Sequence, residues 1–291
     1  MKENYTECFE SERPSLIAIA YQMLGEQSSA QDLVQDTWLI WNKTDKTNIK
    51  SPSAWLRTVI TRLAIDALKS AKRKREVYIG PWLPEPLIED QRAGPYDQFK
   101  LARECELALM WAMERLSAEE RSAFILRKVF DSDYTELSTV LGKSEAACRK
   151  IVSRASKRVA ETKLKFSVAP EETGLMLQKF AQACSSMNHD EVLSLLAPDA
   201  VSISDGGGRV RAALRPLNGA NEVTSVLLSI LRKSPLKDAA KLALANRQPA
   251  IVVTGRHDER MVLTIGLNGE SRISWIYIMR NPDKLQALTI G

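Results

Sequence analysis

Residues Ser51 to Arg75 read SPSAWLRTVITRLAIDALKSAKRKR, and this segment predicts one long helix. Ser51 is a favoured N-cap residue, and Pro52 follows at the first helical position, where a fixed φ and a missing N–H are tolerated. Apolar residues recur at helical spacing and predict a buried face: Leu56, Val59, Ile60, Leu63 and Ala67. The segment ends in four consecutive basic residues, Lys72 to Arg75. The helix therefore has a core side and a basic side.

The positive charge of the chain is concentrated in two segments. The 291 residues carry a net charge of +5. Arg62 to Arg75 contains six basic residues and one acidic residue, and Lys143 to Arg158 contains the same numbers. The rest of the chain is therefore net negative. Two basic helices on an otherwise acidic chain indicate a nucleic acid partner, although a basic segment taken alone is more often a solvated surface.

The order of predicted elements divides the chain into three folded parts and a linker. Residues 1–76 and 98–166 are predicted to be all-helical, the second part including one helix from Gln98 to Arg115. Residues 77–97 are rich in proline and glycine and predict an extended linker. Its apolar residues, such as Trp82, indicate docking in a groove or an interdomain strap. Residues 170–291 predict helices followed by an antiparallel sheet, an α+β domain.

A helix-turn-helix is predicted in the second helical part. Asp133 caps a helix from Tyr134 to Leu141, Gly142 ends it, and Ser144 caps the next helix. In this motif the start of the second helix lies against base edges in the major groove. The residues of this helix predicted to face outward are Glu145, Arg149, Lys150, Ser153, Arg154 and Lys157. Arginine can pair with guanine, and serine or lysine with phosphate; a solvated helical hairpin is the alternative.

Several classes of protein are disfavoured by composition. The four cysteines are scattered and form no C-x-x-C pair, so we expect no disulfide framework, no metal site and no cofactor. Reduced thiols and a polar start from Met1 to Glu12 indicate a cytoplasmic protein without a signal peptide. The sequence contains no run of 18 apolar residues, so no membrane-spanning helix is expected.

The first 165 or so residues resemble an extracytoplasmic-function (ECF) RNA polymerase sigma factor. The resemblance rests on AQDLVQDTWLIWNK from Ala30, AWLRTVITRLAIDALKSAKRKR from Ala54, and YTELSTVLGKSEAACRKIVSRASKRV from Tyr134. It implies that residues 1–76 are sigma region 2, which binds core polymerase and the −10 promoter element. It implies that residues 98–166 are sigma region 4, which reads the −35 element. The implied partners are promoter DNA and the β′ clamp and β flap of core RNA polymerase.

The resemblance also assigns residues to each contact. The implied polymerase contacts are Asp32, Leu33, Gln35, Asp36, Trp38 and Trp41. The implied −10 contacts are Arg62, Asp66, Lys69, Lys72, Arg73 and Arg75. The implied −35 contacts are Ser144, Glu145, Arg149, Lys150, Ser153 and Arg154. The loop from Asn42 to Lys50 is where this family captures a base flipped out of the stack.

The last domain resembles a SnoaL-like cone, which one ECF subfamily carries at its C-terminus. The three marker motifs of that subfamily are WLPEP, DGGGR and NPDKL. The residues of these motifs with an implied regulatory role are Trp82, Leu83, Pro84, Glu85, Pro86, Asp205, Gly206, Gly207, Gly208, Asn281, Pro282, Asp283, Lys284 and Leu285. The resemblance implies control in cis through the linker, with no separate anti-sigma factor. Without the resemblance, DGGG is equally compatible with a loose turn, and NPDKL is compatible with the end of a strand.

Two other functions fit parts of the sequence. SnoaL-like folds include enzymes, and the acid–base candidates here are His189, Asp190, Asp199, Asp205, His257, Asp258 and Glu259. Both histidines are predicted in loops, and the inward positions are predicted apolar: Val201, Ile203, Leu263, Ile265 and Ile276. We therefore expect no catalysis, whereas a small apolar ligand in the cone is an alternative. The other alternative is a helix-turn-helix regulator with a ligand-binding or enzymatic domain, which leaves the first helical part unexplained.

Overall fold

The chain folds into two units in the computed structural model. The described residues are 5–75, 77–89, 97–161, 169–233, 240–254, 260–286 and 288, with the backbone alone of 73–75 and 233. The first unit comprises residues 1–76, 92–105 and 109–162. The second comprises residues 77–91, 106–108 and 163–291, so the proline-rich segment belongs with the C-terminal domain.

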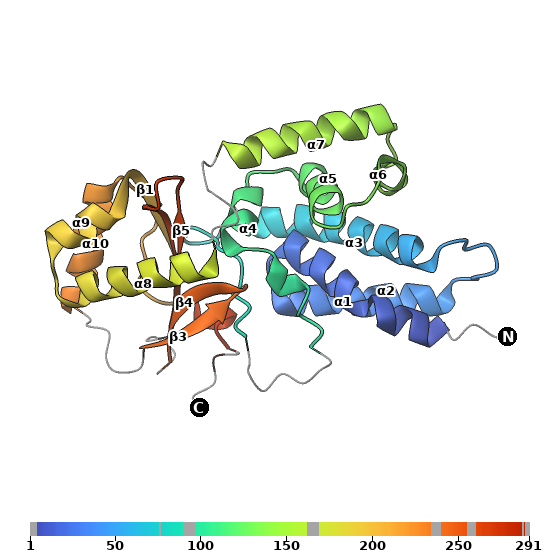
Figure 1. The fold of residues 1–291 in the computed structure, drawn as a ribbon. Coiled ribbons are helices and arrows are strands. Elements are labelled where there is room, and N and C mark those ends of the chain that lie inside the picture. Colours follow the sequence, from blue (N-terminus) through green and yellow to red (C-terminus); the bar gives the residue numbers. More distant parts are fainter. Residues whose placement is uncertain are drawn as a thin grey trace. The chain divides into compact units, whose positions relative to one another are not determined.

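Three long helices form the first part of the first unit. They are α1 (Tyr5–Leu24), α2 (Gln27–Lys43) and α3 (Pro52–Arg75), and α1 packs against both others (Figure 1). The predicted start of α3 is confirmed, because the Ala54 N–H donates to Ser51 Oγ at 3.4 Å. The apolar faces of the three helices meet in a core that includes Phe9, Leu16 and Leu56.

The second part of the first unit contains shorter elements. They are a 3₁₀ turn, η1 (Ala102–Glu104), and the helices α4 (Leu107–Met113), α5 (Ala118–Lys128), α6 (Tyr134–Leu141) and α7 (Glu145–Ala160), although the first two residues of α4 are counted with the second unit. The predicted single helix from Gln98 to Arg115 is wrong. The Asp97 carboxylate accepts the Phe99 N–H at 3.0 Å and pairs with Arg103, which favours a turn there.

The predicted helix-turn-helix is confirmed as α6 and α7. Asp133 caps α6 by accepting the Glu136 N–H at 2.7 Å, and Gly142 ends it with φ of +63°. Ser144 then caps α7 by accepting the Ala147 N–H at 3.3 Å. The glycine is required here because its left-handed conformation strains most other residues.

The second unit packs three helices on a six-stranded sheet. The helices are α8 (Pro170–Ser185), α9 (His189–Leu195) and α10 (Ala220–Lys233). The strands are β1 (Leu196–Asp205), β2 (Leu217–Asn218), β3 (Ala240–Ala245), β4 (Gln248–Val253), β5 (Met261–Leu267) and β6 (Ile273–Met279), in the order β2-β1-β6-β5-β4-β3. Strands β1 and β6 are parallel and the other pairs antiparallel, so the sheet is mixed and not antiparallel throughout.

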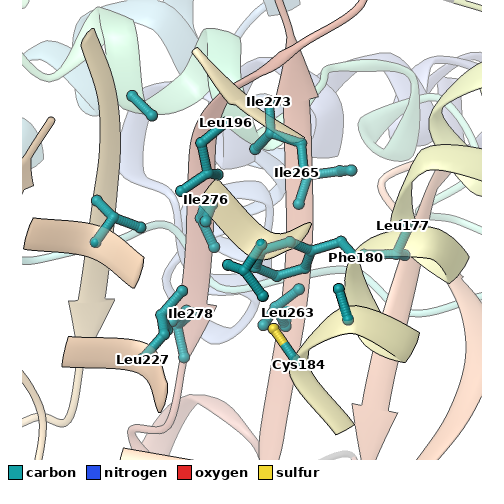
Figure 2. Packing of buried hydrophobic residues seen from close by; sticks show 14 of the residues in the cluster. Leu177, Phe180, Cys184, Leu196, Leu227, Leu263, Ile265, Ile273, Ile276 and Ile278 are labelled. Carbon is teal, nitrogen blue, oxygen red and sulfur yellow. The ribbon is translucent and has the colours of Figure 1, made fainter. Parts of the chain in front are cut away.

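The two faces of this sheet have different coverings. An apolar cluster that includes Leu177, Phe180, Leu263 and Ile265 fills the face toward the helices (Figure 2). Its members come from β1, β2, β4, β5 and β6 as well as from the helices. The expectation that Val201 and Ile203 of β1 face this cluster is wrong. Val201 and Ile203 are paired with Trp275 and Tyr277 of β6, and these four residues lie on the other face.

The acid–base pairs considered above are not assembled into a site by the described residues. His189 and Asp190 lie side by side at 3.5 Å, with exposed side chains, at the start of α9. His257, Asp258 and Glu259 lie outside the described residues. Among the residues described, no cluster of three or more His, Cys, Asp or Glu side chains could hold a metal ion. None of the described helices is both long and apolar enough to cross a membrane.

The cysteines give a simple test of packing in both units. Cys8 is partly exposed, whereas Cys105, Cys148 and Cys184 are buried. Burial raises the pKa of Cys148 and raises that of Cys184 to about 12, so both stay as unreactive thiols at neutral pH. We expect a thiol reagent at pH 8 to modify Cys8 rapidly and the other three only on unfolding. A second fast thiol in the native protein would contradict this packing.

Candidate nucleic-acid interface and the linker strap

The second helix of the helix-turn-helix presents a basic surface. Arg149, Lys150, Ser153 and Arg154 are exposed on α7, as is its cap Ser144, while Glu145 is half-buried. The first four of these residues and Lys143 line an open groove beside the helix. The structure therefore brings the predicted −35 contacts together on one accessible face.

Arg149 is oriented by its neighbours. Its Nη2 lies 2.9 Å from a Glu145 carboxylate oxygen, and its guanidinium lies 4.8 Å from the centre of the Tyr134 ring. Thr135 donates to the other oxygen of Glu145 at 3.1 Å. Because these two contacts already restrict the Arg149 side chain, it loses less conformational freedom if it binds a further partner.

A buried carboxylate fixes α7 against α5. Glu120 accepts the Ser117 N–H at 3.0 Å, completing a capping box, and pairs with Arg158 at 2.7 Å. Burial raises the pKa of Glu120, but the hydrogen bonds from Ser117 and the charges of Arg158 and Arg154 outweigh it and hold the pKa below its ordinary value. The pair is therefore intact at neutral pH and is lost only as the pH falls through this lowered pKa.

The predicted −10 contacts on α3 have different environments. Asp66 and Lys69 form an exposed pair at 3.6 Å. Arg62 donates to the Thr139 carbonyl at 2.6 Å and the Val140 carbonyl at 3.2 Å, and Lys72 donates to the Leu116 carbonyl. The side chains of Arg73 and Arg75 lie outside the described residues.

The predicted polymerase contacts on α2 divide into surface and core. Asp32, Gln35 and Asp36 are exposed and Trp38 is half-buried. Leu33 and Trp41 are buried. Two apolar residues of the same helix are also exposed and were not among the predicted contacts: Leu39, 49% exposed, and Ile40, 38% exposed. Their spacing from Asp36 on the helix was the signal that could have found them.

The loop after α2 is held in shape by side chains. The Asp45 carboxylate accepts hydrogen bonds from the Thr47 N–H and hydroxyl, which hold its pKa below the ordinary value. The Lys46 ammonium lies 4.8 Å from the centre of the Trp41 ring and 5.2 Å from that of Tyr5. These contacts hold the start of the loop for which the family resemblance predicts capture of a flipped base.

Residues 77–89, hereafter the strap, lie on the face of the sheet opposite the helices. Leu83 and Leu87 are buried, and the Tyr277 hydroxyl on β6 donates to the Pro84 carbonyl. At its far end the strap pairs with β3, where the Glu89 N–H donates to the Leu244 carbonyl at 2.9 Å. The apolar residues noticed in the sequence are therefore the buried side of a strap.

A buried carboxylate holds the other end of the strap. Asp205 is fully buried at the end of β1. It accepts the Tyr78 hydroxyl at 2.6 Å and the Leu83 N–H at 3.0 Å. The Lys284 ammonium lies 2.8 Å from Asp205, donates to the Leu83 carbonyl at 2.6 Å, and sits 4.1 Å from the centre of the Trp82 ring. The Asp205 carboxylate therefore binds the N–H of Leu83, and the Lys284 ammonium binds the carbonyl of the same residue.

The glycines of DGGGR permit this close approach. A Cβ on Gly207, which has φ of +63°, would lie 2.5 Å from the Asn281 side chain. A Cβ on Gly206 would lie 2.3 Å from the Val210 carbonyl oxygen, and one on Gly208 3.0 Å from Ile79. Asn281 in turn donates to the Tyr78 hydroxyl at 2.8 Å. The three motifs singled out in the sequence therefore form one interlocked cluster, and the DGGG loop is not a loose turn.

Comparisons with known proteins match these two units. The family model for Sigma-70 region 2 matches residues 8–74, and that for Sigma-70 region 4 matches residues 106–159. The ECF RNA polymerase sigma factor SigJ of Mycobacterium tuberculosis is 36% identical over 251 residues, which cover 85% of this chain and 80% of that protein. The probable ECF RNA polymerase sigma factor SigI of the same species is 30% identical over 188 residues, 64% of each chain. The crystal structure of SigJ superposes with a TM-score of 0.79 at 30% identity and covers 98% of this chain and 100% of that chain.

Proposed function

Since the chain belongs to the extracytoplasmic-function family of RNA polymerase sigma factors, we propose that its C-terminal domain controls the sigma regions in cis through the strap. A sigma factor is not an enzyme: it binds core RNA polymerase and directs it to promoter DNA. Region 2 corresponds to helices α1–α3 and region 4 to helices α4–α7. The strap connects these two regions in the sequence.

The observation that carries this proposal is the anchoring of the strap at both of its ends. Asp205 and Lys284 bind the strap just after the end of region 2, and Leu244 and Asn246 bind it shortly before region 4 begins. The chain leaving region 2 and the chain entering region 4 are thereby fixed to one sheet. A substitution of Asp205 or Lys284 therefore changes how freely both sigma regions can move, although neither residue belongs to a sigma region.

The proposal includes specific contacts for each region. On α3 we assign the −10 contacts to Arg62, Asp66, Lys69, Lys72, Arg73 and Arg75. On and before α7 we assign the −35 contacts to Ser144, Glu145, Arg149, Lys150, Ser153 and Arg154. On α2 we assign the polymerase contact to the exposed residues Asp32, Gln35, Asp36 and Trp38, with Leu39 and Ile40 added. Leu33 and Trp41 support this surface from beneath.

The strap takes the place of a separate anti-sigma factor in this proposal. An anti-sigma factor restrains a sigma factor by holding its regions, and the anchored strap supplies such restraint within the chain. A small apolar ligand is not needed for it, because the apolar cluster already fills the helix-facing side of the sheet (Figure 2).

Transcription in vitro with core RNA polymerase tests the proposal. The full chain is compared with one ending at Arg280, which removes Lys284 and the NPDKL motif, and one ending at residue 168. We expect promoter-dependent product from the full chain and a severalfold different level from each truncated chain. The control is Glu270→Gln, an exposed change in the turn between β5 and β6 that lies outside the three motifs. Equal product from all chains would refute control in cis, and no product from any would refute promoter-directed initiation.

Removing Arg149 should weaken promoter binding and relax base preference. A bidentate contact to guanine is worth about 1–3 kcal/mol, so Arg149→Ala should lower holoenzyme affinity about tenfold or more. Fluorescence anisotropy would measure this on a promoter selected by the holoenzyme from a randomised −35 library. Lys157→Ala is the matched control, since it removes one positive charge further along the same helix. Equal losses from the two variants would contradict base reading by Arg149.

A further inference from the structure

The first turn of α6 contributes two side chains to the surface of α7 that is assigned to the −35 element, and neither was among the predicted contacts. Tyr134 is the first residue of α6 and Thr135 is the second. Tyr134 is half-buried and Thr135 is exposed. Tyr134 contacts Arg149, and Thr135 contacts Glu145, one helical turn earlier on α7. Both helices of the helix-turn-helix therefore shape the surface that α7 presents.

The Tyr134 ring lies beside two guanidinium groups. Its centre is 4.8 Å from the guanidinium of Arg149 and 5.5 Å from that of Arg127, which belongs to the last turn of α5. The face of an aromatic ring carries partial negative charge and attracts cations. Asp131 and the Tyr134 hydroxyl also accept hydrogen bonds from Arg127, which raise the pKa of that guanidinium. Tyr134 is therefore held by α5, and it in turn holds Arg149 of α7.

The Glu145 carboxylate links Arg149 to Thr135. One of its oxygens accepts a hydrogen bond from Arg149 Nη2 at 2.9 Å, and the other accepts the Thr135 hydroxyl at 3.1 Å. The side chains of Glu145 and Arg149 are 43% and 55% exposed, and an ion pair so accessible to water restricts its partners only weakly. The two contacts from α6 therefore add restraint that the ion pair within α7 does not supply.

Arg149 keeps enough donors for a base while these contacts are in place. A guanidinium carries five N–H donors in one plane, and Glu145 accepts one of them. A guanine edge takes two, at O6 and N7. Both bonds form together only if the guanidinium lies in the plane of the base edge, whereas a phosphate accepts donors from many directions. The position of Arg149 therefore matters more for recognising guanine than for total affinity.

We propose that Tyr134 and Thr135 are positioning residues for the −35 element: the ring holds Arg149 and the hydroxyl holds Glu145, so that the guanidinium meets a guanine edge. The inference rests on the proposed function, in which Arg149 is a −35 contact, and deepens it by making guanine recognition a property of both helices. Neither residue needs to touch DNA in this role. The role concerns base preference, so it is separate from control by the strap.

Holoenzyme assembled from the full chain tests the inference through a ratio of affinities. Fluorescence anisotropy at one salt concentration compares the selected promoter with a duplex in which the guanine pair read by Arg149 is replaced. We expect Tyr134→Leu, which keeps apolar volume but loses the ring face, to lower this ratio about three- to fivefold. Thr135→Val, which keeps the shape but loses the donor, should lower it about twofold or more. Tyr134→Phe and Thr135→Ser keep the ring and the hydroxyl and should keep the ratio.

Two further readouts separate positioning from damage to the fold. In an Arg149→Ala background, Tyr134→Leu should leave the affinity for the selected promoter unchanged, because a residue that acts through Arg149 has no effect once Arg149 is absent. The dependence of affinity on salt should also stay the same, since no phosphate contact is lost. Thr139→Val is the matched control. It removes an exposed hydroxyl of α6 that donates to the Thr135 carbonyl at 3.1 Å, and it should leave the ratio unchanged.

The possible outcomes distinguish this inference from the proposed function. An unchanged ratio in Tyr134→Leu, a ratio lowered as much by Tyr134→Phe, or a further loss of affinity in the Arg149→Ala background would each overturn the inference. A ratio that Arg149→Ala itself leaves unchanged would refute the −35 assignment, and the inference with it. A ratio changed by Arg149→Ala but not by the variants of α6 would refute the inference alone.

Discussion

Replacing Asp205 by alanine should lower the free energy of unfolding of the second unit by about 3–5 kcal/mol, because it leaves a buried ammonium without its counter-charge. Asp205 is fully buried and binds Lys284, the Tyr78 hydroxyl and the Leu83 N–H. After the substitution Lys284 keeps its contacts with the Leu83 carbonyl and with the Trp82 and Tyr78 rings, none of which carries a counter-charge. Urea unfolding measures the loss, and hydrogen exchange at the Leu83 amide reports release of the strap.

Two further variants show where this energy resides. Lys284→Met added to Asp205→Ala removes the unpaired charge and should recover much of the loss, since the effects of contacting residues are not additive. Asp199→Ala, an exposed carboxylate on the same strand, should change the free energy of unfolding by less than about 1 kcal/mol. If Asp205→Ala cost no more than Asp199→Ala, the cluster would not be what anchors the strap.

Trp41→Ala should destabilise the first unit by about 3–5 kcal/mol, and its effect on polymerase binding should follow from that loss. The side chain is fully buried, donates from Nε1 to the Tyr5 carbonyl at 3.0 Å and packs against Trp55 at 5.3 Å between ring centres. Thermal unfolding measures the change in stability. Trp41→Phe keeps most of the packing and should restore binding to core polymerase.

The exposed residues of α2 should behave in the opposite way. Leu39→Ala and Ile40→Ala remove side chains that are 49% and 38% exposed, so we expect changes in stability below about 1 kcal/mol. Their affinity for core polymerase should nevertheless fall severalfold, as a titration with labelled chain would measure. Full affinity in both variants would place the polymerase contact elsewhere on region 2.

The sequence predicted elements whose signals are local. The long helix α3 follows from its cap and apolar spacing, and the helix-turn-helix follows from Asp133, Gly142 and Ser144. The helix predicted from Gln98 failed because Asp97 stabilises a competing turn. The parallel pairing of β1 with β6, and hence the face on which Val201 lies, depends on contacts between distant segments that periodicity does not encode.

The site shows the same division between local and distant information. The three motifs could be picked out by residue type and by resemblance, and the glycines indicated close approach of the backbone. That Asp205 meets Lys284, 79 positions along the chain, follows only from the fold. The burial of Trp41 and the exposure of Leu39 also depend on how α2 packs against α1 and α3.

The pairing of the strap with β3 has a consequence for solubility. Strand β3 ends the sheet, and it carries Leu242 and Leu244, which are 56% and 37% exposed. The strap forms backbone hydrogen bonds with part of this edge, at the Leu244 carbonyl and the Asn246 N–H. Unpaired, apolar edge strands recruit other chains into shared sheets. A chain whose strap is released therefore exposes an unpaired apolar edge, and we expect it to self-associate unless another chain covers that edge.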